Sequence, residues 1–172
     1  LAVHAIVSRR VDPFASAAIS VCSVQGGTAF NVIPESVEHR GTARALEAGL
    51  RDRLEEWIRD AVSSAASAHG CRAEVDYRRG YPVTVNDPEE AARAREVAAS
   101  VLGPASVLRE GRRVLGAEDF AYFAQKVPSA YAFLGVRNER KGIVAPNHHP
   151  AFDVDEEVLP KGAALLCALA AS

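Results

Sequence analysis

The sequence predicts a protein of mixed α/β and α+β class, divided into two structural units. Near the start, two stretches of alternating polar and apolar residues precede a long amphipathic helix pattern and a third alternating stretch. This order is typical of an antiparallel sheet with helices packed on one face. The remainder contains mainly helix patterns, and a turn-rich connection separates the two parts. We therefore expect one domain over residues 1–82 and another over residues 83–172.

The composition indicates an ordinary globular protein. Of the 172 residues, 48% are hydrophobic and 24% are charged, which is enough apolar material for a core. The net charge of −2 would not attract nucleic acid, and no apolar run approaches the roughly 18 residues of a membrane span. We therefore expect neither nucleic acid nor a membrane as a partner. The three cysteines are far apart and odd in number, so we expect buried free thiols and a cytoplasmic location.

In the first domain, alternation predicts strands over residues 17–24, 36–43 and 72–79. Apolar residues at spacings of three and four predict a long helix over residues 46–69. Residues 1–9 have the pattern of the end of another helix. Together these elements suit an antiparallel sheet covered by helices.

The predicted elements of the second domain are helices over residues 88–102, 118–126 and 155–170 and a strand over residues 130–136. Asn86 or Asp87 can cap the first of these helices, because a side-chain oxygen there accepts hydrogen bonds from free backbone N–H groups. Pro88 then suits the first helical turn.

Two adjacent histidines, His148 and His149, lie in a proline-containing loop just before an acidic helix start. Neutral imidazole is a common zinc ligand, and catalytic zinc sites leave one coordination position open. Neighbouring side chains on an extended segment point apart, so at most one of the two would bind a given ion. A solvated loop with two incidental histidines explains the pattern equally well. The nearby acids are more simply explained as carboxylates at a helix N-terminus.

Three further side chains are candidates for a substrate site, and each has a simpler alternative. Glu118 could support a ligand histidine or line a pocket, although helix capping explains it more simply. Asn31 could donate a hydrogen bond to a developing oxyanion, or it could satisfy a local turn. Arg44, at the end of a predicted strand, could clamp a substrate carboxylate through two hydrogen bonds, or be an ordinary surface charge.

These candidates lie within five sequence segments that follow one another along the chain: Gly26-Gly-Thr-Ala-Phe-Asn31-Val-Ile-Pro34, Arg40-Gly-Thr-Ala-Arg44, Tyr77-Arg-Arg-Gly-Tyr-Pro82, Gly116-Ala-Glu-Asp-Phe120 and His148-His-Pro-Ala-Phe-Asp153. In this order they resemble the C-terminal part of metal-dependent amidohydrolases of the aminoacylase/carboxypeptidase superfamily. Bacterial hippurate hydrolases and plant auxin-conjugate (IAA-amino acid) hydrolases are the members that the segments resemble most. The resemblance covers essentially the whole chain.

The resemblance implies an α/β zinc-peptidase-like catalytic domain interrupted by a ferredoxin-like lid domain that also forms homodimers. It implies two divalent metal ions, which could be zinc, manganese, cobalt or nickel. Their ligands and the general-base glutamate would lie mainly in an N-terminal half preceding Leu1, and His148 matches the one family ligand that remains. Asn31 and Arg44 match a lid amide and a lid arginine. By this resemblance Asn31 is catalytic and binds substrate, Arg44 grips its terminal carboxylate, and Glu118 lines the substrate site.

The implied reaction is metal-dependent hydrolysis of the amide bond of N-acyl amino acids or small peptide-like substrates. Because most of the metal ligands would be missing, we expect the 172 residues to be an incomplete and inactive fragment. Two alternatives stay open, namely a stand-alone ferredoxin-like dimerisation module and a non-catalytic remnant of such a hydrolase. The residues indicate neither the acyl group, the amino acid nor the metal.

Overall fold

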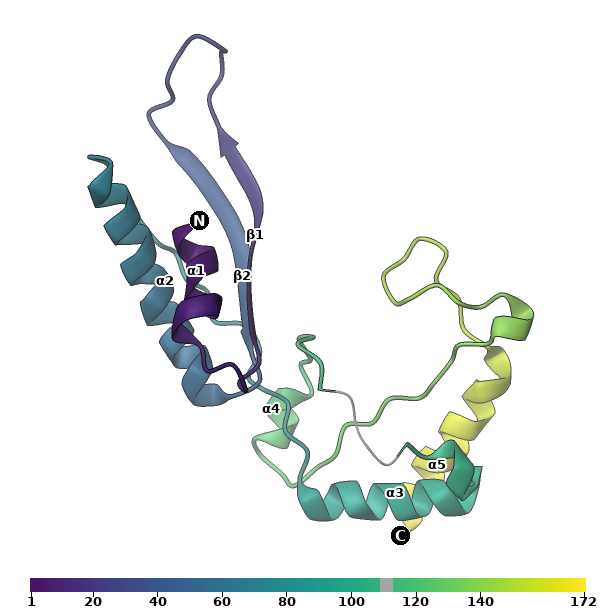
Figure 1. Ribbon diagram of the computed structural model, residues 1–172. Helices are drawn as coiled ribbons and strands as arrows, with labels where there is room; N and C mark the ends of the chain where they lie inside the picture. Colours follow the sequence, from purple (N-terminus) through teal and green to yellow (C-terminus); the bar gives the residue numbers. More distant parts are fainter. Residues whose placement is uncertain (109–112) are drawn as a thin grey trace. The chain divides into compact units, whose positions relative to one another are not determined.

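The chain folds into two compact units (Figure 1). The computed structural model describes residues 1–108 and 113–172. Within this described chain, unit 1 comprises residues 1–83 and 113–119, and unit 2 comprises residues 84–108 and 120–172. The described residues combine helices with a two-stranded antiparallel sheet, so the predicted mixed class is confirmed.

Unit 1 contains α1 (Ala2–Arg10), β1 (Ala17–Gly26), β2 (Val37–Ala45) and α2 (Ala48–Ala68). The first two predicted strands, the long helix and the helix at the start of the chain are therefore confirmed. Their ends are displaced by no more than two residues, which is the usual uncertainty of element boundaries.

The β1–β2 hairpin is paired along its whole length, with Ala18 opposite Arg44 near the end away from the connecting loop. One irregularity interrupts the register at Cys22, which is the extra residue of a β-bulge. Gly41 faces this position. A Cβ atom on Gly41 would lie 2.2 Å from a carbonyl oxygen of β1, so the close approach of the two backbones requires glycine.

The core of unit 1 is small and apolar. Ile6 of α1 and both Leu50 and Leu54 of α2 are almost completely buried. Burial of each such side chain contributes roughly 1.5–3 kcal/mol. Partly buried hydrophobic residues of both helices and both strands surround them: Val11, Ala15, Ala17, Ile19, Ala43, Ala45, Trp57, Ile58 and Ala61. The two helices thus pack on the hairpin through one apolar layer.

Residues 72–79, predicted as a third strand, form no strand and pair with none in the described chain, so that prediction is wrong. Their burial alternates as expected, but a strand also needs a neighbouring backbone to complete its hydrogen bonds. Arginines of α2 supply those bonds instead. Arg59 Nη1 donates to the carbonyl of Val75 and Arg51 Nη2 to that of Gly80, each at 2.7 Å.

Ion pairs also connect residues 72–79 to α2. Arg79 pairs with Asp52 and with Glu55, and Arg59 also binds Glu55. The hydrogen bonds from Arg59 and then Arg79 lower the pKa of the Glu55 carboxyl. Burial beside these charges raises the pKa of the Tyr77 hydroxyl. Side chains of α2, rather than a neighbouring strand, therefore hold this segment in place.

Unit 2 is built from short elements: α3 (Pro88–Leu102), the 3₁₀ turns Pro104–Ser106, Glu139–Lys141 and Glu156–Val158, α4 (Ala121–Ala124) and α5 (Leu159–Ala171). The predicted first and last helices of this part are confirmed. Asp87 caps α3, because its carboxylate accepts hydrogen bonds from the N–H groups of Glu89 at 2.9 Å and Glu90 at 3.1 Å.

Two predictions for unit 2 need correction. The helix predicted over residues 118–126 is confined to α4, because its first helical hydrogen bond runs from the Ala124 N–H to the Phe120 carbonyl. The strand predicted over residues 130–136 forms no ladder in the described chain. There the Asn86 side chain, rather than a neighbouring strand, binds the backbone of Tyr131. Its Nδ2 donates to the carbonyl of Tyr131 at 3.0 Å, and its Oδ1 accepts from the Tyr131 N–H at 2.8 Å.

The surface differs from the prediction in one respect. Cys22, Cys71 and Cys167 are free but exposed, so the expectation that they are buried is wrong. In the described residues, no helix has both the length and the apolar character required to span a membrane.

Candidate functional site

Asn31 lies in the loop that connects β1 to β2, at the far tip of the hairpin (Figure 1). Its side chain is exposed and makes no hydrogen bond to any other described residue. Its neighbours Phe30 and Ile33 are also almost fully exposed, at 104% and 93%. The hairpin tip therefore exposes the Asn31 amide next to exposed apolar side chains. The Asn31 side chain makes no local turn contact, so the alternative explanation of this residue does not apply.

Arg44 lies at the opposite end of the same hairpin, where it faces Ala18 across the strand pair. Its Nη1 donates to the carbonyl of Leu115 at 2.8 Å, although the two residues are 71 positions apart in the chain. Both belong to unit 1. Among the described residues Arg44 pairs with no carboxylate, so its positive charge is available to a ligand.

Glu118 is half-buried in the segment that follows Leu115 in unit 1. It does not lie in a helix, because α4 begins only at Ala121 and has Phe120 as its N-cap, without a side-chain capping bond. Glu118 is therefore not the N-cap residue of α4. Arg44 and Glu118 belong to one unit, with Leu115 as the link between β2 and this segment.

His148 lies in unit 2, in a loop before α5. Its φ of 69° places it in the left-handed region, which is uncommon for a residue other than glycine. Its N–H donates to Oδ1 of Asn147 at 3.1 Å, and its exposed ring makes only a 3.5 Å contact with the Asn147 amide. The ring of His149 instead accepts the N–H of Ala151 at Nδ1, at 3.0 Å. The two adjacent histidines thus have different environments.

A polar cluster closes the base of the His148 loop. Asp155 is 7% exposed and its carboxylate accepts hydrogen bonds from Lys141 Nζ at 2.6 Å and Asn138 Nδ2 at 2.7 Å. Asn138 also pairs with Ile143 through two backbone hydrogen bonds of 2.9 Å. Lys141, and then Asn138, lower the pKa of Asp155, and that carboxylate in turn raises the pKa of Lys141.

Sequence reasoning assigned Asp155 only to a helix start. That assignment is correct as far as it goes, since the carboxylate also accepts the N–H of Glu157 at 3.4 Å, but it missed the closure of the loop. The sequence could have indicated this closure only through Asn138 and Lys141, which lie 17 and 14 residues before Asp155. Neither spacing corresponds to the period of a helix or a strand.

The described side chains do not form a metal site by themselves. They contain no group of three or more histidine, cysteine, aspartate or glutamate residues that could hold an ion. His148 is therefore at most one ligand, whereas a catalytic zinc site ordinarily takes three from the protein. No catalytic step through a metal follows from these residues alone.

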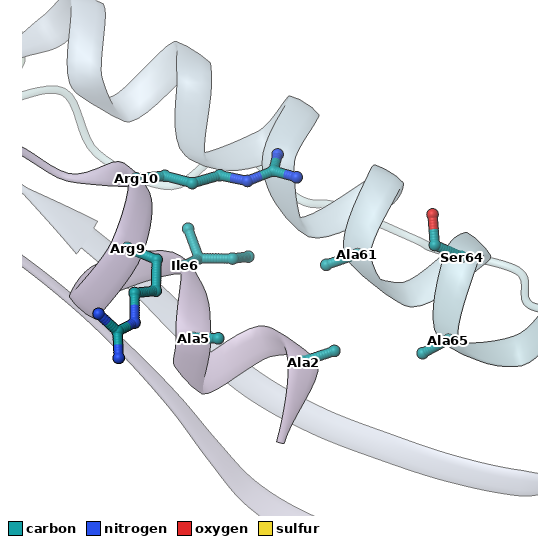
Figure 2. Close-up of a pocket in the computed structure, with 8 residues that line it drawn as sticks. All are labelled: Ala2, Ala5, Ile6, Arg9, Arg10, Ala61, Ser64 and Ala65. Atoms are coloured by element: carbon teal, nitrogen blue, oxygen red, sulfur yellow. The ribbon is translucent and has the colours of Figure 1, made fainter. Parts of the chain in front are cut away.

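A cavity of about 420 Å³ lies between α1 and α2, and none of the candidate residues is among those that line it (Figure 2). Alanine side chains and Ile6 are its apolar lining, and Arg9, Arg10 and Ser64 are the polar residues that line it. Arg10 also approaches Asp60 at 4.0 Å. The cavity is a gap between two helices of small residues rather than a converging set of catalytic groups.

Comparison with known proteins identifies the class to which this fold and these residues belong. The sequence profile of Peptidase family M20/M25/M40 matches residues 3–172. The chain therefore belongs to this peptidase family, and its resemblance to the aminoacylase/carboxypeptidase superfamily is confirmed.

Individual relatives support the same assignment. The chain is 40% identical over 163 residues to Thermostable carboxypeptidase 2 of Saccharolobus solfataricus. This match covers 94% of this chain and 40% of that protein. It is 35% identical over 174 residues to IAA-amino acid hydrolase ILR1-like 2 of Arabidopsis thaliana. This match covers 99% of this chain and 39% of that protein. The structure of the Bacillus subtilis YXEP protein, a dinuclear metal binding peptidase from the M20 family, matches with a TM-score of 0.75 and 32% identity. That match covers 90% of this chain and 41% of the other. The chain thus spans about 40% of the length of these relatives.

Proposed function

We propose that the whole protein is a metal-dependent amidohydrolase that cleaves the amide bond of N-acyl amino acids or small peptide-like substrates. The supporting observation is that a carboxypeptidase and an IAA-amino acid hydrolase each match 94% or more of the chain. In both named substrate classes a carboxylate lies close to an amide bond, so one recognition group would serve both.

In this proposal Arg44 binds the terminal carboxylate of the substrate. The exposed guanidinium has no carboxylate partner within the described chain, and an arginine pairs with a carboxylate through two parallel hydrogen bonds. Asn31 would stabilise the oxyanion or bind the substrate carbonyl, for which its free amide donor is suited. Glu118 would line the same region of unit 1 as Arg44.

The separation of Asn31 and Arg44 favours a homodimer. Val37, beside the tip loop, and Arg44 are seven positions apart in β2, and at a rise of about 3.3 Å per residue this is about 23 Å. An N-acyl amino acid is much shorter, so Asn31 and Arg44 of one copy would contribute to different sites. A homodimer formed through the lid would let a second copy supply the missing group. The molar mass in solution, measured by light scattering, tests whether the chain forms this homodimer. Twice 18.3 kDa is expected, and a monomer at all concentrations would contradict it.

His148 would be one ligand of a centre of two divalent ions, which could be zinc, manganese, cobalt or nickel. The relative described as a dinuclear metal binding peptidase supports this number of ions. We also propose a cytoplasmic location, which the three free cysteines support.

We further propose that the 172 residues alone are inactive, because their described part contains no complete set of metal ligands. The test is hydrolysis of hippurate by this chain with added zinc, manganese, cobalt or nickel, followed by release of glycine. No turnover is expected. Turnover accompanied by stoichiometric metal binding would contradict the inactivity, and would leave the proposed reaction standing.

A further inference from the structure

The guanidinium of Arg44 uses only part of its donor capacity. An arginine has five N–H donors in a planar fork, with a side edge formed by Nε and Nη2. Nη1 of Arg44 is engaged by the Leu115 carbonyl at 2.8 Å. Neither Nε nor Nη2 has an acceptor in residues 1–108 and 113–172.

Two other arginines of the chain show what this arrangement accommodates. Arg59 donates Nη1 to the carbonyl of Val75 at 2.7 Å, and its Nε and Nη2 donate to the Glu55 carboxylate at 3.2 and 3.0 Å. Arg93 donates Nη1 to the carbonyl of Leu169 at 3.0 Å, and its side edge binds a glutamate at 3.0 and 2.7 Å. In both, a main-chain carbonyl holds Nη1 while the Nε–Nη2 edge binds a carboxylate.

Arg44 has the first half of this arrangement without the second. We propose that the main-chain carbonyl of Leu115 is a positioning group, which fixes the Arg44 guanidinium so that its Nε–Nη2 edge receives the substrate carboxylate. This inference rests on the proposed function. It adds which edge of the arginine binds, and it makes the segment around Leu115 part of the recognition site.

A fixed guanidinium has a physical advantage over a mobile one. An exposed arginine loses side-chain entropy when it binds, and this loss offsets much of the gain from an ion pair. The Leu115 hydrogen bond orders the Arg44 side chain before the ligand arrives. It also leaves the Nε–H and the parallel N–H of Nη2 free, and this pair matches a planar carboxylate rather than a neutral amide.

Titration of the isotopically labelled chain with hippurate, followed by NMR at slightly acidic pH, tests the proposal. Hippurate should shift the Arg44 Nε–H resonance and leave the carbonyl ¹³C resonance of Leu115 in place. Hippuramide, which lacks the carboxylate, should shift neither. Arg44→Lys keeps the charge but loses the fork, so affinity should fall roughly tenfold, followed through the amide resonances of Ala43 and Ala45. Arg40→Lys on the same strand, whose wild-type partner is Glu38, is the matched control and should leave affinity unchanged.

Each outcome is decisive. If hippurate shifts Arg44 and also moves the Leu115 carbonyl, the ligand displaces that carbonyl, and the positioning role is overturned while Arg44 remains a carboxylate site. If hippurate leaves Arg44 unshifted, both the inference and the proposed role of Arg44 are overturned. Equal binding by Arg44→Lys and the wild type overturns the use of the two-donor edge.

Discussion

The two units hold their structure in different ways. Unit 1 has an apolar centre of three almost completely buried side chains, Ile6, Leu50 and Leu54. In unit 2, the described residues classed as buried are Ala121 and one carboxylate, that of Asp155. Unit 2 combines ring contacts among Phe120, Tyr131 and Phe133 with polar side chains that bind backbone groups, such as Asn86 and Asp87. A buried apolar centre therefore distinguishes the first unit, whereas the second adds specific hydrogen bonds to partly exposed packing.

This difference extends to the candidate site residues. Arg44 extends from a strand of the packed unit and is held by one hydrogen bond to Leu115. His148 lies on a loop whose shape depends on the polar cluster at Asp155. The residue proposed to bind a carboxylate is thus supported by a core, whereas the candidate metal ligand is supported by a few hydrogen bonds.

The largest effect is expected from the core of unit 1. Leu54→Ala should reduce the free energy of unfolding by about 2–5 kcal/mol, because a fully buried leucine leaves a cavity when truncated. Urea unfolding followed by the fluorescence of Trp57, the only tryptophan and a neighbour of this core, measures it. Leu166→Ala on α5 is the control, since that side chain is 70% exposed and should cost less than about 0.5 kcal/mol. Equal effects of the two variants would refute a core confined to unit 1.

A smaller effect is expected where a side chain replaces a strand in unit 2. Asn86→Ala removes both hydrogen bonds to the Tyr131 backbone and should cost about 1–2 kcal/mol. Faster hydrogen exchange of the Tyr131 amide should accompany the loss. Asn86→Asp keeps the acceptor for that amide but loses the donor, so it should fall between the wild type and the alanine variant. Unchanged exchange in Asn86→Ala would show that the pairing is not needed for order.

The cap of α3 should contribute about 1 kcal/mol, since Asp87 satisfies two free N–H groups of the first turn. Asp87→Ala should therefore lower the helix content and the thermal midpoint of unit 2, as measured by circular dichroism. Asp87→Ser retains a capping oxygen and should restore most of the loss. If serine and alanine behave alike, the cap does not stabilise the helix.

The smallest effect is one that depends on pH. The pKa of Asp155 is lowered by Lys141 and then Asn138, so the native state favours the ionised carboxylate. Its stabilising contribution is fully present above the unfolded pKa of about 3.9 and is lost as pH falls through the lower native pKa. Asp155→Asn should therefore lower the melting temperature at neutral pH, and the difference from the wild type should shrink below about pH 4. In a Lys141→Met background the same substitution should have a smaller effect. A difference that is constant with pH would exclude the ion pair as its cause.

Much of unit 1 and the outer helices of unit 2 could be predicted from local pattern. Period-two and period-3.6 spacing marks β1, β2, α2 and α3, and the Asp87-Pro88 pair marks the start of α3. The errors at residues 72–79 and 130–136 have one cause. An alternating pattern (residues 72–79) or a short apolar run (residues 130–136) predicts which side chains are buried, but a strand also needs a partner backbone. In both places arginine or asparagine side chains bind the backbone instead.

For the site, the sequence could identify residue types but not their contacts. Asn31, Arg44, Glu118 and His148 were predicted as candidates and stay so. The bond between Arg44 and Leu115 joins residues 71 positions apart, and no periodicity reveals it. The same holds for the cluster around Asp155, whose partners come from a turn of no regular spacing. Contacts of this kind depend on tertiary structure alone.

The Arg44–Leu115 hydrogen bond also constrains how the gene of this protein can be divided. Neither unit is contiguous in sequence, because residues 113–119 belong to unit 1 while residues 84–108 and 120–172 belong to unit 2. A recombination joint near residue 83 would transfer β2 with its arginine and leave behind the carbonyl that Arg44 binds. A recombinant protein would keep this hydrogen bond as it is here only if β2 and residues 113–119 both came from the same parent.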